Sequence, residues 1–354
     1  MSDTQKHTKS NVPNLRFPEF DNNWHSISLD ELAPGIASGR SKASVGSYAL
    51  IGSTGIIGTT SKAEYSGKLI LVARVGANAG FINYFEGTYG ITDNTLIVKT
   101  KDQDEDFCKY IYYYLNHENL NKLVFGSGQP LITGGMLKRV KVFLGGHKEI
   151  SKISLFLSLI DERISIQNKV IEKYESLIKA LAYETIGKHV PNVTLSECVQ
   201  CSSSSIKESE LAAEGTVSAY GASGVSGFME IALNEGDSIL ITKDGSGVGS
   251  LRYVSGPHSF VGTLNSMTPK EGVYLPYIYY ALQNVCFESY RTGQAIPHIY
   301  FKDYGKAAVF CPSFDDQKRL AIGLEMIDAK IGTERAALQN LKLAKAYFLS
   351  ALFI

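Results

Sequence analysis

The sequence has little that would support a disulfide framework, a membrane helix or a large net charge. Five cysteines in 354 residues are too few and too scattered for a disulfide scaffold, so we expect free thiols in a cytoplasmic protein. No apolar run approaches the roughly 20 residues of a membrane helix, and the polar first dozen residues contain no stretch suited to a secretory signal. The 35 basic and 35 acidic residues cancel, which argues mildly against a bulk nucleic-acid binder. Affinity for phosphate nevertheless depends on where charges lie and not on their sum.

Motifs for catalysis and for metal binding are also missing. No serine occupies a Gly-x-Ser-x-Gly elbow, and no Gly-Lys pair is followed by Ser or Thr, so a Walker loop is absent. The chain also has no Pro-Pro dipeptide, which excludes the Asn/Asp-Pro-Pro-aromatic signature of adenine methyltransferases. Cys198 and Cys201 form a lone CxxC, which supplies two of the four ligands of a structural zinc site. The glycines of Asp244–Gly249 lack the spacing of a dinucleotide-binding loop, so we interpret them as a turn at the end of a strand. We therefore expect a binding protein without metal or cofactor of its own, with an enzyme whose site is unrecognised as one alternative.

The chain contains one long segment twice. Five pairs of similar segments follow one another in the same order, with an offset of 165 to 169 residues: 48–58 with 217–227, 70–80 with 239–249, 111–116 with 278–283, 126–132 with 291–297, and 160–164 with 327–331. A solenoid would repeat at a much shorter period. The sequence therefore predicts a duplicated domain of about 165 residues.

The first part of each copy is rich in Gly, Ser and aromatic residues. Short apolar runs bounded by glycine predict buried strands at Leu69–Val72, Thr95–Val98 and Ser238–Thr242. Short helices are expected around Ile111–Leu115 and Ile278–Leu282. Strands and helices interspersed in this way indicate a mixed α/β (α+β) domain.

The second part of each copy is helical and carries a heptad pattern. The predicted seam comprises Ile153, Leu157, Ile160, Ile164, Gln167 and Ile171 in the first copy, and Leu324, Ile327, Ile331, Glu334, Leu338 and Leu341 in the second. Such a narrow, sustained stripe favours a coiled coil between the two helices over a helix that lies on its own domain. Because a whole domain separates the helices, we expect them to be antiparallel, with an internal pseudo-twofold axis. The polar interruptions Gln167 and Glu334 would then lie close together and fix the register.

Several segments resemble the specificity subunits of type I restriction–modification enzymes. The opening Pro13–Phe20, with Trp24 and Leu29–Leu32 after it, is similar to the usual entry of that family. Gly126–Ile132 resembles the segment that closes its first target-recognition domain, and Lys148–Ile164 resembles the start of its spacer helix. The resemblance covers nearly the whole chain and occurs twice.

This resemblance implies a domain organisation. It comprises a flexible tail (1–14), target-recognition domain 1 (15–147), spacer helix 1 (148–186), target-recognition domain 2 (187–313) and spacer helix 2 (314–354). Gly145–His147 stands where relatives often have proline and an acidic residue, which leaves the start of the first helix open.

The resemblance also implies a function and partners. Such a subunit reads a split target in double-stranded DNA, one half with each recognition domain, and has no membrane partner. Two methyltransferase subunits, which carry S-adenosylmethionine, would dock largely on its helices, and restriction subunits that use ATP and Mg would join them. The main alternative is a protein-interaction scaffold with the same repeat and helices that binds no DNA.

Candidate DNA contacts are basic or polar residues in the loops of each copy. We expect Arg40, Lys42, Lys62, Arg74, Asn78, Lys138 and Arg139 in the first domain, and Lys207, Lys243, Ser246, Arg252, Arg291, Lys302 and Lys306 in the second. Gln129 and Gln294 match between the copies, so we expect them to order a loop instead of reading a base.

The length of the helices suggests that they set the gap between the half-sites. A helix of about 35 residues spans roughly 50 Å, more than the roughly 34 Å of one DNA turn. Insertion of one heptad should therefore change the gap or abolish recognition, and an unchanged gap would refute this hypothesis.

Overall fold

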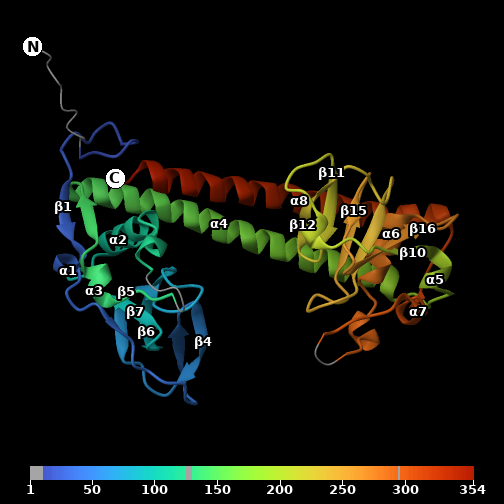
Figure 1. Ribbon diagram of the computed structural model, residues 1–354, viewed down its shortest axis with the longest axis horizontal. Helices are drawn as coiled ribbons and strands as arrows, with labels where there is room; N and C mark the ends of the chain where they lie inside the picture. The colour runs from blue at the N-terminus through green and yellow to red at the C-terminus, as the bar shows by residue number, and fades with distance from the viewer. Residues whose placement is uncertain (1–10, 125–129, 294–295) are drawn as a thin grey trace, which may run out of the picture. The chain divides into compact units, whose positions relative to one another are not determined.

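The computed structural model describes residues 11–124, 130–293 and 296–354, which form two compact units (Figure 1). Unit 1 comprises the chain up to Gln167 together with Ala337–Ile354, and unit 2 comprises Asn168–Ala336. Two long helices, α4 (His147–Ala182) and α8 (Phe314–Ala351), are each divided between the two units. Both units combine sheets and helices, which confirms the predicted mixed α/β class. None of the helices in the described residues is long and apolar enough to cross a membrane.

Unit 1 is built on a six-stranded sheet with the strand order β2-β7-β5-β6-β3-β4. Its strands are β2 (Ala37–Ser38), β3 (Tyr48–Gly52), β4 (Gly55–Thr60), β5 (Tyr65–Ala73), β6 (Ile82–Ile91) and β7 (Thr95–Val98). Neighbouring strands are antiparallel except β3 and β6, which pair in parallel. A separate antiparallel pair joins β1 (His25–Ser28) to β8 (Lys141–Leu144). The shorter helices are α1 (Leu29–Leu32), α2 (Glu105–His117), the 3-10 helix η1 (Leu120–Leu123) and α3 (Gly134–Lys138).

The core of unit 1 lies between this sheet, α2 and the two long helices. Asp104 caps α2 by accepting a hydrogen bond from the Phe107 backbone NH at 3.1 Å. Tyr110 and Tyr114 on the buried face of α2 are fully buried. The ring of Phe353, which follows α8, lies 5.3 Å and 5.5 Å from theirs between centroids. The residues that follow α8, Leu352 and Phe353, therefore complete a core that also contains Trp24 near the start of the chain.

Unit 2 has the same kinds of elements. One antiparallel sheet has the order β10-β16-β13-β14, a second has the order β12-β11-β15, and β17 pairs with β9. The strands are β9 (Val193–Thr194), β10 (Val199–Ser203), β11 (Val217–Gly221), β12 (Gly224–Met229), β13 (Ser238–Thr242), β14 (Leu251–Val254), β15 (Ser259–Phe260), β16 (Leu264–Pro269) and β17 (Ala308–Val309). The helices are the π-helix η2 (Tyr183–Gly187), α5 (Leu195–Cys198), η3 (Glu208–Glu210), α6 (Leu275–Leu282), η4 (Phe287–Tyr290) and α7 (Phe301–Tyr304), of which η3 and η4 are 3-10 helices. The strands and helices predicted in both copies are confirmed.

Irregular details of strand pairing recur in both units. The β3–β4 hairpin has a register shift between Leu50 and Ile51, and the β11–β12 hairpin has one between Ala219 and Tyr220, 169 residues later. Leu50 pairs in parallel with β6, and Ala219 pairs in parallel with β15. Bulges of this kind are specific features of a strand pair, so the two units share a scaffold and not only a composition.

The two long helices pack against each other within each unit. In unit 1 the rings of Phe156 and Phe348 lie 4.8 Å apart between centroids, and Lys345 Nζ lies 2.5 Å from Asp161 Oδ1. The later residue on α8 faces the earlier residue on α4, so the helices are antiparallel there. In unit 2, Arg335 Nη2 lies 2.6 Å from Glu175 Oε1.

All the predicted seam residues are buried or half-buried. Those classed as buried are Ile153, Leu157, Ile171, Leu324 and Ile331. Burial of these positions and the antiparallel contacts agree with the coiled-coil hypothesis. Continuous heptad packing, a pseudo-twofold axis and proximity of Gln167 to Glu334 stay predictions.

The start of unit 1 is attached to the fold. Within the expected tail, the carbonyl of Asn11 accepts a hydrogen bond from the Trp24 backbone NH at 2.9 Å, and Pro13 is buried. The described part of that segment is therefore packed instead of loose. Helix α4 begins at His147, and the carbonyl of Gly146 accepts from the backbone NH of Ile150 at 3.0 Å.

Candidate DNA interface

One turn in unit 1 carries two of the predicted DNA-binding residues, Arg74 and Asn78. It joins β5 to β6 and is closed by a hydrogen bond of 2.9 Å from the Gly80 backbone NH to the Ala73 carbonyl. Gly76 and Gly80 have φ values of 78° and 93°, which residues with side chains rarely adopt. The glycines of the repeated motif are therefore needed to form this turn.

The backbone of Arg74 is held on both sides. Its NH donates to the Asn94 carbonyl and its carbonyl accepts from the Ile132 NH, each at 2.9 Å. Ile132 ends the repeated segment 126–132; Gln129 of that segment lies outside the described residues. The Arg74 side chain is half-buried, and its Nε has no hydrogen-bond partner among the described residues. A rigid backbone thus holds a guanidinium that no described carboxylate neutralises.

Unit 2 has the same turn between β13 and β14. The Lys243 NH donates to the Thr263 carbonyl, and the Lys243 carbonyl accepts from the Ile299 NH, each at 2.9 Å. The Gly249 NH closes the turn onto Thr242 at 2.9 Å. Lys243 and Arg74 therefore occupy equivalent positions on equivalent scaffolds. Gln294 lies outside the described residues.

The side chains on the two turns differ although the backbones match. Unit 1 presents the exposed amide of Asn78, and unit 2 presents the exposed hydroxyl of Ser246. Guanidinium and ammonium groups bind phosphate oxygens, and guanidinium and amide groups also bind base edges in distinct patterns. One scaffold with two sets of polar groups is suited to binding two different short sequences.

Three other predicted residues of unit 2 lie beside aromatic rings or near the turn. The guanidinium carbon of Arg252, on β14, lies 5.9 Å from the centroid of the Tyr220 ring. Lys302 Nζ lies 5.2 Å from the ring centroid of Tyr300, which is itself exposed. Lys207 is exposed and follows Ile206, whose carbonyl accepts a hydrogen bond of 2.8 Å from the Gly262 NH. The next residue, Thr263, is the one that accepts from the Lys243 NH, so the Lys207 loop lies beside the turn.

Two of the predicted DNA-binding residues are less available to phosphate than the others. Lys138 pairs with Asp30 at 3.0 Å, and Arg291 pairs with Glu288 at 2.7 Å, so each already has a carboxylate partner. The remaining candidates are simply exposed: Arg40, Lys42, Lys62, Arg139 and Lys306. All the proposed DNA contacts stay predictions.

Sequence reasoning missed the aromatic partners of the basic residues. Tyr220 and Arg252 are far apart in the chain, so no local pattern joins them, whereas Tyr300 stands two residues before Lys302 and offered a weak signal. Among the described residues, no group of three or more His, Cys, Asp or Glu side chains could hold a metal ion.

Comparison with known families connects these features to DNA specificity. The family model described as "Type I restriction modification DNA specificity domain" matches residues 17–176. By this match, residues 17–176, a little less than half of the chain, are similar to that domain. The matched residues include the whole Arg74 turn and most of α4. None of the curated proteins matches the chain.

Two solved structures share the fold of this chain. The structure of a type I restriction–modification system S subunit from M. genitalium is 22% identical, with a TM-score of 0.66 over 97% of this chain and 99% of that chain. A chain from a structure entitled "Structural basis underlying complex assembly and conformational transition of the type I R-M system" is 15% identical, with a TM-score of 0.50 over 94% of this chain and 97% of that chain. At these identities the similarity shows the fold, and it extends through both units.

Proposed function

We propose that this chain is the non-catalytic specificity subunit of a type I restriction–modification enzyme. Each unit reads one half of a two-part DNA target, and the bases between the halves are not read. The observation that carries the proposal is the repeated turn, which holds Arg74 and Lys243 in equivalent positions among different polar neighbours. A constant backbone with variable side chains is suited to recognition of two unlike half-sites, because phosphate contacts position the protein and side chains at base edges specify the sequence.

The partners follow from the same proposal. Methyltransferase subunits carry S-adenosylmethionine, restriction subunits carry the ATP- and Mg-dependent machinery, and this chain itself binds no cofactor. Its contribution is to position both activities on double-stranded DNA.

Exposed apolar pairs on the long helices are suited to receive methyltransferase subunits. Leu155 and Leu159 on α4 are 56% and 50% exposed, and Ile322 and Met326 on α8 are 61% and 70% exposed. The second pair follows the first by 167 residues, and each pair is spaced i, i+4 on one helix face. Clustered apolar side chains on a surface mark protein interfaces, and two equivalent pairs support docking of two methyltransferase subunits.

Replacing one pair should remove one partner. The double change Leu155→Glu and Leu159→Glu should yield a complex with a single methyltransferase, because burying two carboxylates at an interface is costly. Native mass spectrometry of the co-purified complex measures this directly. Val190→Glu, at a residue that is 83% exposed outside both pairs, is the control; retention of two methyltransferases by the double variant would contradict the assignment.

A genome-wide map of N6-methyladenine, with and without this gene, tests the proposed function. Loss of methylation at one two-part motif with a fixed gap is the expected result. An unchanged methylome in a host with an expressed partner methyltransferase would favour the scaffold alternative. Binding of DNA that weakens steeply with salt would separate the two in vitro.

A further inference from the structure

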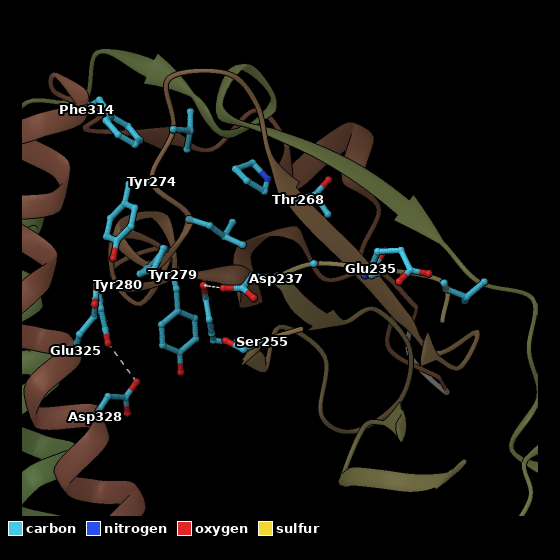
Figure 2. Close-up of a pocket in the computed structure, with 18 residues that line it drawn as sticks. Glu235, Asp237, Ser255, Thr268, Tyr274, Tyr279, Tyr280, Phe314, Glu325 and Asp328 are labelled. Atoms are coloured by element: carbon cyan, nitrogen blue, oxygen red, sulfur yellow. Dashed lines mark hydrogen bonds between the residues drawn. The ribbon is translucent and has the colours of Figure 1, made fainter. Parts of the chain in front are cut away.

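Unit 2 contains a cavity of about 880 Å³ between α8, α6 and the strands β14 and β16 (Figure 2). Figure 2 shows Glu325 and Asp328 on one side of it, with Asp237 and Ser255 on the other. We call it the acidic pocket after its four carboxylates, which are Glu235, Asp237, Glu325 and Asp328. No lysine, arginine or histidine lines it.

Aromatic rings form much of the wall of the acidic pocket. They are Tyr253, Tyr274, Tyr279, Tyr280 and Phe314. The hydroxyl of Tyr253 donates to Asp237 at 2.6 Å, and that of Tyr280 donates to Asp328 at 3.3 Å. Faces of aromatic rings and carboxylates both attract cations, and they do so more strongly when partly shielded from water.

Two carboxylates of the acidic pocket, Glu325 and Asp328, are incompletely satisfied, whereas Asp237 also accepts a hydrogen bond of 2.9 Å from the Gly256 backbone NH. One carboxylate oxygen of Glu325, Oε1, is buried without a hydrogen-bond partner among the described residues. Burial raises the pKa of Asp328, and the Tyr280 hydroxyl and the charge of Arg335 offset this only in part. Arg335 itself is paired with Glu175. An unpaired buried acceptor is costly, so these groups would gain from a donor.

Unit 1 shows what satisfies the equivalent groups. There Tyr113 donates to Asp161 at 2.9 Å, and Lys345 Nζ lies 2.5 Å from Asp161 and 5.7 Å from the centroid of the Tyr113 ring. Tyr280 and Asp328 are the counterparts of Tyr113 and Asp161, each 167 residues later.

The counterpart of Lys345 in unit 2 is Ile178, which carries no charge. No ion pair among the described residues involves Asp328 or Glu325. The unit 1 counterparts of Asp237 and Glu325 are Lys68 and Ser158, so negative charge accumulates in unit 2 alone. Unit 2 therefore has the acceptors of this arrangement without a cation paired to Asp328, since Arg335 pairs with Glu175 instead.

We propose that the acidic pocket receives an arginine or lysine side chain of the methyltransferase subunit. The pocket is too acidic for a DNA phosphate, and its volume accommodates a long basic side chain with part of its backbone. This inference rests on the proposed function. Because unit 1 has Lys68 and Ser158 in place of Asp237 and Glu325, the two methyltransferase subunits bind with unequal affinity, and the tighter site is on unit 2.

The test uses the full-length chain and the methyltransferase subunit of the same host, with binding followed by sedimentation velocity. The double change Glu325→Gln and Asp328→Asn keeps shape and removes charge. It should weaken one of the two binding steps roughly 10- to 100-fold, as expected when a partly buried charge pair is lost. Asp161→Asn, whose cation comes from within the chain, is the matched control and should leave both steps unchanged. Wild-type affinity in the double variant, or equal weakening of both steps, would overturn the inference.

A second measurement needs no loss of binding. A photoreactive p-benzoylphenylalanine in place of Phe314, an exposed residue of the pocket wall, should crosslink to a methyltransferase peptide that contains arginine or lysine. A crosslink to DNA, or to a peptide without a basic residue, would refute the proposal. If the wild-type chain bound no methyltransferase and directed no methylation, both the proposed function and this inference would fail. A normal wild-type complex with an unaffected double variant would remove the inference alone.

Discussion

Glu149→Ala should lower the free energy of unfolding of unit 1 by about 3 kcal/mol. Glu149 is 1% exposed and accepts two hydrogen bonds from Arg16, at 2.7 Å and 2.8 Å, and one from Trp24 Nε1 at 3.0 Å. The variant leaves the Arg16 guanidinium, whose side chain is only 14% exposed, without its carboxylate. Because Arg16 retains some contact with water, the cost stays at the low end for a broken buried pair.

Trp24 is the only tryptophan of the chain, so its fluorescence during urea unfolding reports directly on this cluster. Glu184→Ala removes the carboxylate of an exposed pair with Lys188 and should leave the midpoint unchanged. A midpoint for Glu149→Ala equal to that of this control would show that the cluster contributes little to stability.

Charge reversal at the repeated turns should have the second large effect. Under the proposed function, Arg74→Glu and Lys243→Glu should each weaken binding of the assembled complex to its DNA target by roughly 10- to 100-fold, because each would replace a cation at the phosphate backbone with an anion that phosphate repels. Fluorescence anisotropy with labelled target DNA at several salt concentrations measures this loss. The salt dependence should also become shallower, since fewer counterions are released.

Lys188→Glu is the matched control, because it reverses an exposed charge that is paired with Glu184 and lies outside the turns. Equal losses in this control would mean that net charge and not the turn is responsible. Unchanged affinity in both turn variants would remove the turns from the DNA interface.

Much of the fold could be predicted because its signals are local and occur twice. Gly76 and Gly80 mark a turn that requires positive φ, and Gly245 and Gly249 repeat them 169 residues later. The buried strand at Ser238–Thr242 stands out as an apolar run bounded by glycine. Signals of this kind depend on backbone geometry, and the sequence displays them directly.

The sequence did not reveal interactions between distant side chains. By sequence alone Lys138 is as good a candidate for DNA contact as its neighbours, but in the structure it pairs with Asp30. Gly145 looked like a departure from the family, but a Cβ there would lie 2.4 Å from Glu149 Oε2 and 2.7 Å from Trp24 Nε1. The glycine makes room for the buried cluster. The acidic pocket combines residues from Leu233 to Asp328, whose proximity depends on tertiary packing.

The division of the long helices between the units has a consequence for folding during synthesis. Unit 2 is made of one continuous stretch, Asn168–Ala336, whereas unit 1 needs Ala337–Ile354 to cover Tyr110 and Tyr114. On the ribosome, the half that is translated first is therefore the last to close its core. Until then its aromatic surface is open to chaperones, and a released chain truncated after residue 336 would carry a finished second half and an unfinished first half.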